Sequence, residues 1–180
     1  MGRAICVYCS SSDLVDGAYF EAAEGLGRLI AEGGHTLVYG GGSIGLMGAL
    51  ARAVHQHRGR VIGVIPDSMV ERELAYRDAD ELIVTDNMRQ RKAVMDERAA
   101  AFIALPGGFG TLEELIEALT HRQLKYHDKP VVIVNLNGFY DPLLRFFEHF
   151  IEQHFAKPKH RDSYRVVRDP VAAMVYLESG

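Results

Sequence analysis

Short apolar runs alternate with amphipathic stretches along the 180-residue chain. The apolar runs are rich in β-branched side chains and end at glycine, proline or polar residues, as buried strands do. They predict strands at residues 4–8, 36–39, 61–65, 82–85, 99–105, 131–135 and 164–167. Uninterrupted apolar strands are typical of a parallel sheet that is covered on both faces.

Apolar residues at helical spacing lie between these strands. They predict helices at about residues 18–32, 46–57, 88–98, 142–154 and 170–177, and one that starts near Thr111 and reaches Leu124. The first of these ends at Gly33 and Gly34. Because strands and helices alternate throughout, we expect the α/β class, in one domain of residues 1–180.

The charge balance limits the partners that the chain is expected to bind. Lys and Arg number 20 and Asp and Glu number 24, so the net charge of −4 argues against a nucleic-acid partner. No apolar run has the length of a transmembrane segment or the pattern of a signal peptide. We therefore expect a cytoplasmic protein without a membrane partner.

Cysteines and histidines give little support for a metal or redox site. Cys6 and Cys9 form C-x-x-C without the second pair that a zinc site needs, so a thioredoxin-like redox pair and buried or loop thiols both stay open. The eight histidines are scattered, and His55-x-His57 lacks an obvious third ligand. We expect no metal.

A glycine-rich turn joins the predicted strand 99–105 to the helix that follows it. Three glycines within four residues let main-chain N–H groups approach a ligand, and the helix directs its positive end at the same place. This favours a bound phosphate, to which Thr111 adds a hydroxyl, while Glu113 and Glu114 lie to one side and can act on the rest of the ligand. The glycines are Gly107, Gly108 and Gly110.

A structural interpretation of the same turn stays open. Thr111 at the N-cap and Glu114 at the third helical position would form a capping box. In the phosphate-binding interpretation, by contrast, either Gly108 or Gly110 would adopt a positive φ, which glycine permits. A cap alone, however, does not need three glycines before it.

A second glycine-rich turn, Gly40 to Gly45, follows the strand 36–39 and matches the G-x-G-x-x-G dinucleotide fingerprint. A dinucleotide site also needs an acidic residue about 20 residues after the first glycine. Asp67 is a poor candidate, because it lies 27 residues after Gly40 and directly follows Pro66. One nucleotide monophosphate held between the two turns fits better, since both turns lie at carboxyl ends of strands. The alternative is that the glycines only permit close packing of helix and strand.

Arg91 and Lys92 lie in the first turns of the predicted helix 88–98, where the helix dipole disfavours cations. An anionic ligand or Glu114 would offset this cost. The alternative is that both side chains form a solvated surface.

Together these motifs resemble the Lonely Guy family of cytokinin-activating phosphoribohydrolases, whose members are often called lysine decarboxylases. The family pattern P-G-G-x-G-T-x-x-E is complete from Pro106 to Glu114, and M-x-x-R-K is complete from Met88 to Lys92. The resemblance extends from Ile5 to about Leu177. It departs at Arg89 and Ala100, where His and Asp are expected.

The resemblance implies a Rossmann-like, doubly wound parallel sheet with helices on both faces, and a homodimer. It implies hydrolysis of the N-glycosidic bond of N6-modified adenosine monophosphates, without a cofactor, to free base and ribose 5-phosphate. Arg91 and Glu114 would be the catalytic pair. The implied substrate-binding residues are Gly41, Gly42, Glu73, Met88, Lys92, Gly107, Gly108, Phe109, Gly110, Thr111 and Glu113.

The residue types suit this chemistry. A carboxylate near C1′ stabilises the oxocarbenium-like charge on the ribose and orients water. A cation helps the purine to leave, so Arg91 either does this or holds Glu114 in place. We expect the dimer to form through the helix near residues 93–101 together with residues 116–124, which offer more apolar surface than one sheet face needs.

Three other functions stay open. A decarboxylase that uses pyridoxal phosphate needs a reactive lysine, and only Lys92 lies in a motif. A dinucleotide-dependent reductase would need a better acidic residue than Asp67. A non-catalytic nucleotide or molybdenum-cofactor carrier would keep the glycine turns without needing Arg91 and Glu114.

Overall fold

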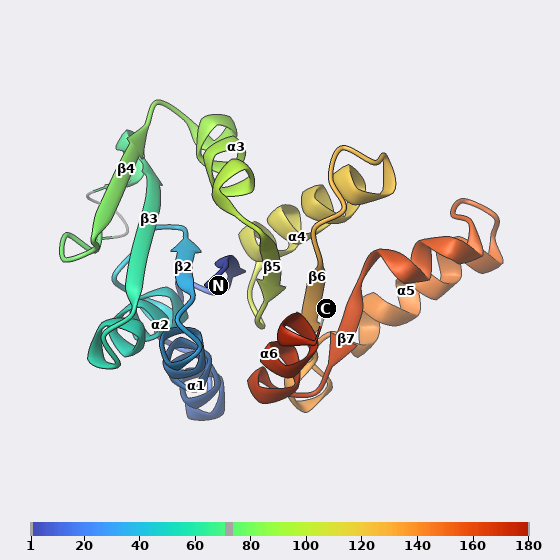
Figure 1. Ribbon diagram of the computed structural model, residues 1–180. Helices are drawn as coiled ribbons and strands as arrows, with labels where there is room; N and C mark the ends of the chain where they lie inside the picture. The colour runs from blue at the N-terminus through green and yellow to red at the C-terminus, as the bar shows by residue number, and fades with distance from the viewer. Residues whose placement is uncertain (1, 71–73, 180) are drawn as a thin grey trace.

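Seven strands form one sheet in the order β4-β3-β2-β1-β5-β6-β7 (Figure 1), and every neighbouring pair is parallel. The computed structural model describes all residues except 1, 71–73 and 180. The strands are β1 (Ala4–Tyr8), β2 (Thr36–Tyr39), β3 (Arg60–Pro66), β4 (Glu81–Thr85), β5 (Ala101–Ala104), β6 (Val131–Val134) and β7 (Arg165–Val167). The predicted α/β class and parallel sheet are confirmed.

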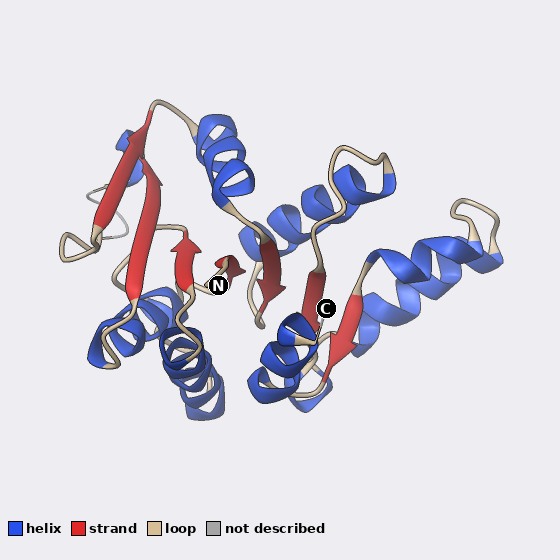
Figure 2. Ribbon diagram, viewed as in Figure 1, coloured by secondary structure: helices blue, strands red, loops and turns tan. Residues whose placement is uncertain are grey.

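Helices connect these strands, as Figure 2 shows. Their bounds agree with the predicted positions to within a few residues. They are α1 (Gly17–Glu32), α2 (Gly45–Gln56), α3 (Met88–Arg98), α4 (Phe109–Gln123), α5 (Asp141–Glu152) and α6 (Pro170–Glu178). Short 3-10 turns lie at η1 (Asp67–Met69), η2 (Leu136–Gly138) and η3 (Pro158–Ser163). In the part of the chain that the structure describes, no helix has the length and apolar character needed to cross a membrane.

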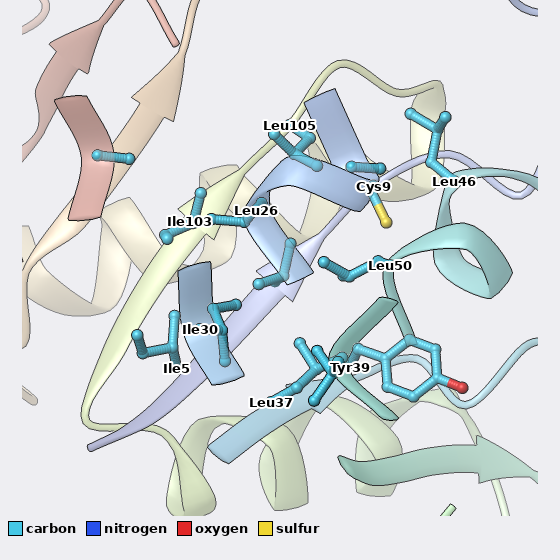
Figure 3. Packing of buried hydrophobic residues seen from close by; sticks show 14 of the residues in the cluster. Ile5, Cys9, Leu26, Ile30, Leu37, Tyr39, Leu46, Leu50, Ile103 and Leu105 are labelled. Carbon is cyan, nitrogen blue, oxygen red and sulfur yellow. The ribbon is translucent and has the colours of Figure 1, made fainter. Parts of the chain in front are cut away.

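Two apolar cores cover the two faces of the sheet. Helices α1, α2 and α6 pack on one face, where Leu26, Ile30 and Leu50 meet strand residues such as Ile103 (Figure 3). Helices α3, α4 and α5 pack on the other face. The inner strands send alternate side chains into each core, which explains why β1, β2, β5 and β6 are almost entirely apolar.

The strand order reverses between β1 and β5. From β1 the chain winds outwards through β2, β3 and β4, and then returns to place β5 on the other side of β1. Tyr8 at the end of β1 lies in register with Ala104 at the end of β5. In open α/β sheets this switch point, beyond the carboxyl ends of the strands, is where ligands bind.

Candidate active site

A cavity of about 380 Å³ opens at the switch point between β1 and β5. Both glycine-rich turns contribute to its wall, through Gly40 from the first and Gly108 to Thr111 from the second. The prediction that the two turns line one crevice is therefore confirmed. The remaining lining residues are Val7, Tyr8, Cys9, Ser10, Ser11, Ser12, Met47, Met69, Met88, Arg91 and Glu114.

The first turn of α4 faces this cavity without a side-chain cap. Gly108 is the N-cap and offers no side chain to the first N–H groups of the helix. A Cβ added at Gly108 or Gly110 would meet no protein atom within 4 Å. The turn therefore leaves room for a ligand at the positive end of a 15-residue helix, as an anion site requires.

The predicted capping box is wrong. The helix begins at Phe109, so Thr111 is already its third residue and Glu114 lies one turn further inside. The Thr111 side chain is buried and packs against Gly107, where any added Cβ would collide with it. The suggestion of a positive φ is also wrong for this turn, because the described glycines with positive φ are Gly34, Gly41, Gly45 and Gly138.

Contacts at the ends of β1 and β5 fix the two loops that frame the cavity. The Tyr140 hydroxyl donates to the carbonyl of Leu105 at 2.7 Å, just before the second glycine turn. The Asp13 carboxylate accepts the N–H of Gly45 at 2.8 Å, which ties the loop after β1 to the first glycine turn. Both loops are thus anchored outside the cavity that they line.

In the first glycine turn, most residues serve close packing. Gly41 and Gly45 have φ values of 79° and 58°, which side chains other than glycine rarely adopt. A Cβ at Gly45 would lie 2.7 Å from the carbonyl oxygen of Ser11. The packing interpretation therefore holds for Gly45, while Gly40 alone of this turn reaches the cavity wall among the described residues.

Arg91 is buried and lies at the cavity wall. Its Nε donates to the carbonyl of Val64 at 3.0 Å and one terminal nitrogen donates to the carbonyl of Gly40 at 2.7 Å. The Asn87 side chain caps α3 by accepting from two first-turn N–H groups, which sets the helix that carries Arg91. The guanidinium is therefore held in one place between β3, the first glycine turn and the cavity.

Lys92 finds its anionic partners on α4. Its Nζ lies 2.5 Å from a carboxylate oxygen of Glu113 and 2.5 Å from one of Glu117. Burial alone would lower the pKa of Lys92, but hydrogen bonds to these two carboxylates outweigh it and raise that pKa. Glu113 and Glu117, and not the predicted Glu114, offset the cost of this cation at the start of α3.

The cavity wall brings together most of the predicted site residues. Arg91, Glu114, Met88, Phe109 and the nearby glycines and threonine of α4 all belong to it. Among the described residues, five predicted ones lie beside the wall without lining it, namely Gly41, Gly42, Lys92, Gly107 and Glu113. Glu73 lies outside the described residues.

Comparison with known proteins places this site in a family. The family described as "Possible lysine decarboxylase" matches residues 47–177. A cytokinin riboside 5'-monophosphate phosphoribohydrolase of Arabidopsis thaliana is 47% identical over 160 residues, which are 89% of this chain and 74% of that protein. The chain belongs to the cytokinin riboside 5'-monophosphate phosphoribohydrolase family. The resemblance to the Lonely Guy family is thereby confirmed.

A second member of the phosphoribohydrolase family, from Oryza sativa subsp. japonica, is 50% identical over 153 residues. The match covers 85% of this chain, which spans only 63% of that relative's length. Among solved structures, the molybdenum cofactor carrier protein of Chlamydomonas reinhardtii superposes with a TM-score of 0.76, over 99% of this chain and 98% of the other. At 23% identity this likeness shows the fold alone.

The two departures from the phosphoribohydrolase pattern lie away from the cavity wall. Arg89 is exposed in the first turn of α3, and Ala100 is exposed between α3 and β5. Neither departure changes the described residues that line the cavity.

Sequence reasoning missed the loop after β1 and two methionines. Tyr8 to Ser12, Met47 and Met69 all line the cavity, although no motif assigned them to the substrate site, and Cys9 was noted only as part of C-x-x-C. Residues 9–12 directly follow a predicted strand, and this position was the one sequence signal that they line a ligand site. It was not sufficient, because only the strand order shows that this strand lies beside β5.

The cysteines are buried on opposite faces of the sheet, Cys9 in the core of α1 and α2 and Cys6 in the other. Burial raises the pKa of both thiols, so they stay protonated and unsuited to redox exchange. Within the described residues, no three His, Cys, Asp or Glu side chains gather as metal ligands do.

Proposed function

We propose that this protein hydrolyses the N-glycosidic bond of N6-modified adenosine 5'-monophosphates, with AMP in the same substrate class. The products are the free base and ribose 5-phosphate. The observation that carries the proposal is one cavity that contains the first turn of α4, Arg91 and Glu114. The names of the relatives from Arabidopsis and rice give the same activity.

In this proposal the first turn of α4 binds the 5'-phosphate. The N–H groups of its first residues and the helix dipole both favour an anion, and the absence of side chains at Gly108 and Gly110 lets it approach. Thr111 adds its hydroxyl and Phe109 its main chain. The neighbouring Gly41, Gly42, Glu73, Met88, Lys92, Gly107 and Glu113 complete or support the substrate site.

Glu114 and Arg91 act on the bond between the base and C1′. As this bond breaks, positive charge develops on the ribose, and the Glu114 carboxylate stabilises it and orients the attacking water. The water hydroxyl joins C1′ and the remaining proton ends on the base. The fixed Arg91 guanidinium stabilises the electron density that moves to the purine.

The direct test is incubation with isopentenyladenosine monophosphate and with AMP, followed by chromatography for the free base and ribose 5-phosphate. Isopentenyladenosine without its phosphate is the matched control, because it lacks only the group that α4 binds. Release of base from the monophosphate and not from the nucleoside is expected. Tight nucleotide binding without release would support a carrier instead and overturn the proposal.

Assembly and compartment belong to the same proposal: a cytoplasmic homodimer that forms through α4. The exposed apolar side chains of this region are Phe109, at 93% exposure, Ile116, Leu124 and Tyr126. Residues 93–101 were also expected to supply apolar surface to the dimer interface, and this expectation is corrected. The helix α3 ends at Arg98, and the structure, which describes all of residues 93–101, shows no large exposed hydrophobic side chain there.

A further inference from the structure

Outside the cavity, three side chains form a continuous row of hydrogen bonds from the end of α2 to the start of β3. The Tyr76 hydroxyl lies 2.8 Å from Nδ1 of His55, and Nε2 of the same ring lies 3.0 Å from Oδ2 of Asp80. That Asp80 oxygen also accepts the main-chain N–H of Val61 at 2.8 Å. We call Tyr76, His55 and Asp80 the relay.

The donors and acceptors of the relay follow from its chemistry. An ionised carboxylate only accepts, so Nε2 of His55 carries a hydrogen, and in the neutral ring Nδ1 then accepts from the Tyr76 hydroxyl. Burial alone would raise the pKa of Asp80, but hydrogen bonds from Val61 and His55 outweigh it and lower that pKa. The Tyr76 hydroxyl is a donor at neutral pH, and burial raises its pKa further.

Tyr76 connects this relay to the first glycine turn. Its main-chain N–H donates to the carbonyl of Gly41 at 2.8 Å, and the N–H of Ser43 donates to the carbonyl of Leu74 at 3.2 Å. Gly42 and Ala75 form an antiparallel bridge between these contacts. Residues 74–76 therefore lie along the outer side of the turn that brings Gly40 to the cavity.

The same segment also borders the loop that carries Met69 to the cavity wall. The N–H of Ala75 donates to the carbonyl of Val70 at 3.0 Å, one residue beyond Met69. Two wall residues from different elements, Gly40 and Met69, thus depend on where residues 74–76 lie. The relay is the side-chain anchor of that segment on α2 and β3.

We propose that Tyr76, His55 and Asp80 are positioning residues for nucleotide binding, which hold residues 74–76 and through them the cavity wall at Gly40 and Met69. This inference rests on the proposed function. It predicts weaker binding and not slower chemistry, because Glu114 lies on α4 and Arg91 is also held by Val64.

The test compares variants by KM and kcat for isopentenyladenosine monophosphate. Tyr76→Phe removes one hydroxyl and keeps the ring, whose centroid lies 5.5 Å from that of His55. It should raise KM about two- to tenfold, the factor of one hydrogen bond, and leave kcat within about twofold. His55→Leu should raise KM by a similar factor. The double variant should have the KM of either single variant, since both substitutions disrupt the same hydrogen-bond network.

Two further variants separate positioning from a general structural role. His55→Gln presents one amide acceptor and one amide donor, so it should restore KM toward the wild-type value. His57→Leu is the matched control, because within the described residues the His57 ring hydrogen-bonds only to the carbonyl of Ala53 in the helix that it caps, at 2.9 Å. It should leave KM unchanged.

Unchanged KM in Tyr76→Phe and His55→Leu, or an equal rise in His57→Leu, overturns the inference. If the wild-type protein releases no base, the proposed function fails, and amide hydrogen exchange then tests the relay by itself. Tyr76→Phe should speed exchange at the N–H groups of Tyr76 and Ser43. Exchange at the wild-type rate would refute the relay as an anchor.

Discussion

The substitution Glu114→Gln separates a catalytic carboxylate from a structural one. Glutamine has nearly the same shape and helix propensity as glutamate, so the helix is preserved. Glu114 lies at the sixth position of α4, beyond the first turn, and Gly108 caps that helix without any side chain. The loss of its charge therefore does not remove a cap.

The expected magnitudes follow from this position. Removing one group that stabilises charge in the transition state lowers kcat roughly 10²- to 10³-fold, or about 3–4 kcal/mol. The half-buried Glu114 is replaced without a change in volume, so the free energy of unfolding should change by less than about 1 kcal/mol and Tm by less than about 4 °C. Rate and stability should therefore separate clearly.

The assay measures kcat with isopentenyladenosine monophosphate at saturation, together with thermal unfolding. Glu117→Gln is the matched control: it makes the same change one turn later on α4, in a carboxylate that pairs with Lys92 and is not among the described cavity-lining residues. Its kcat should stay within about twofold, since Lys92 keeps Glu113 as a partner. A Glu114→Gln enzyme with near wild-type kcat would refute the catalytic assignment.

Three other expectations follow from the same structure. Gly108→Ala should keep Tm, because the added Cβ meets no protein atom, yet raise KM at least about tenfold by filling the phosphate site; a KM equal to that of wild type would contradict the phosphate assignment. Burial lowers the pKa of His127, whose ring nitrogens have no hydrogen-bond partner within the described residues. The unfolded chain therefore takes up the proton first, and the free energy of unfolding should fall as the pH drops below about 6.5. Urea unfolding of His127→Phe should therefore show a smaller loss in the free energy of unfolding between pH 8 and pH 5 than the wild type shows. An equal loss in both proteins would mean that another group causes the acid sensitivity. Ile116→Glu should shift the mass in sedimentation from dimer to monomer, and a wild-type monomer at micromolar concentration would exclude the α4 interface.

The sequence alone determined the elements of the fold and the local chemistry of the site. Apolar runs and helical spacing depend on neighbours in the chain, so strands such as β2 (Thr36–Tyr39) and helices such as α3 (Met88–Arg98) were predicted with their observed bounds. The turn proposed to bind phosphate is equally local, since its glycines and its helix are consecutive. The family pattern from Pro106 to Glu114 could therefore be recognised without a structure.

Long-range packing decided the rest. The strand order, which no local pattern encodes, placed Tyr8 to Ser12 beside the second glycine turn and made one cavity of both. Because α4 begins at Phe109, Thr111 lies inside the helix, where its side chain is buried against Gly107 and does not form the capping box. The packing of α3 and α4 on the same face of the sheet gave Lys92 its partners in Glu113 and Glu117, which are 21 and 25 positions away in the chain.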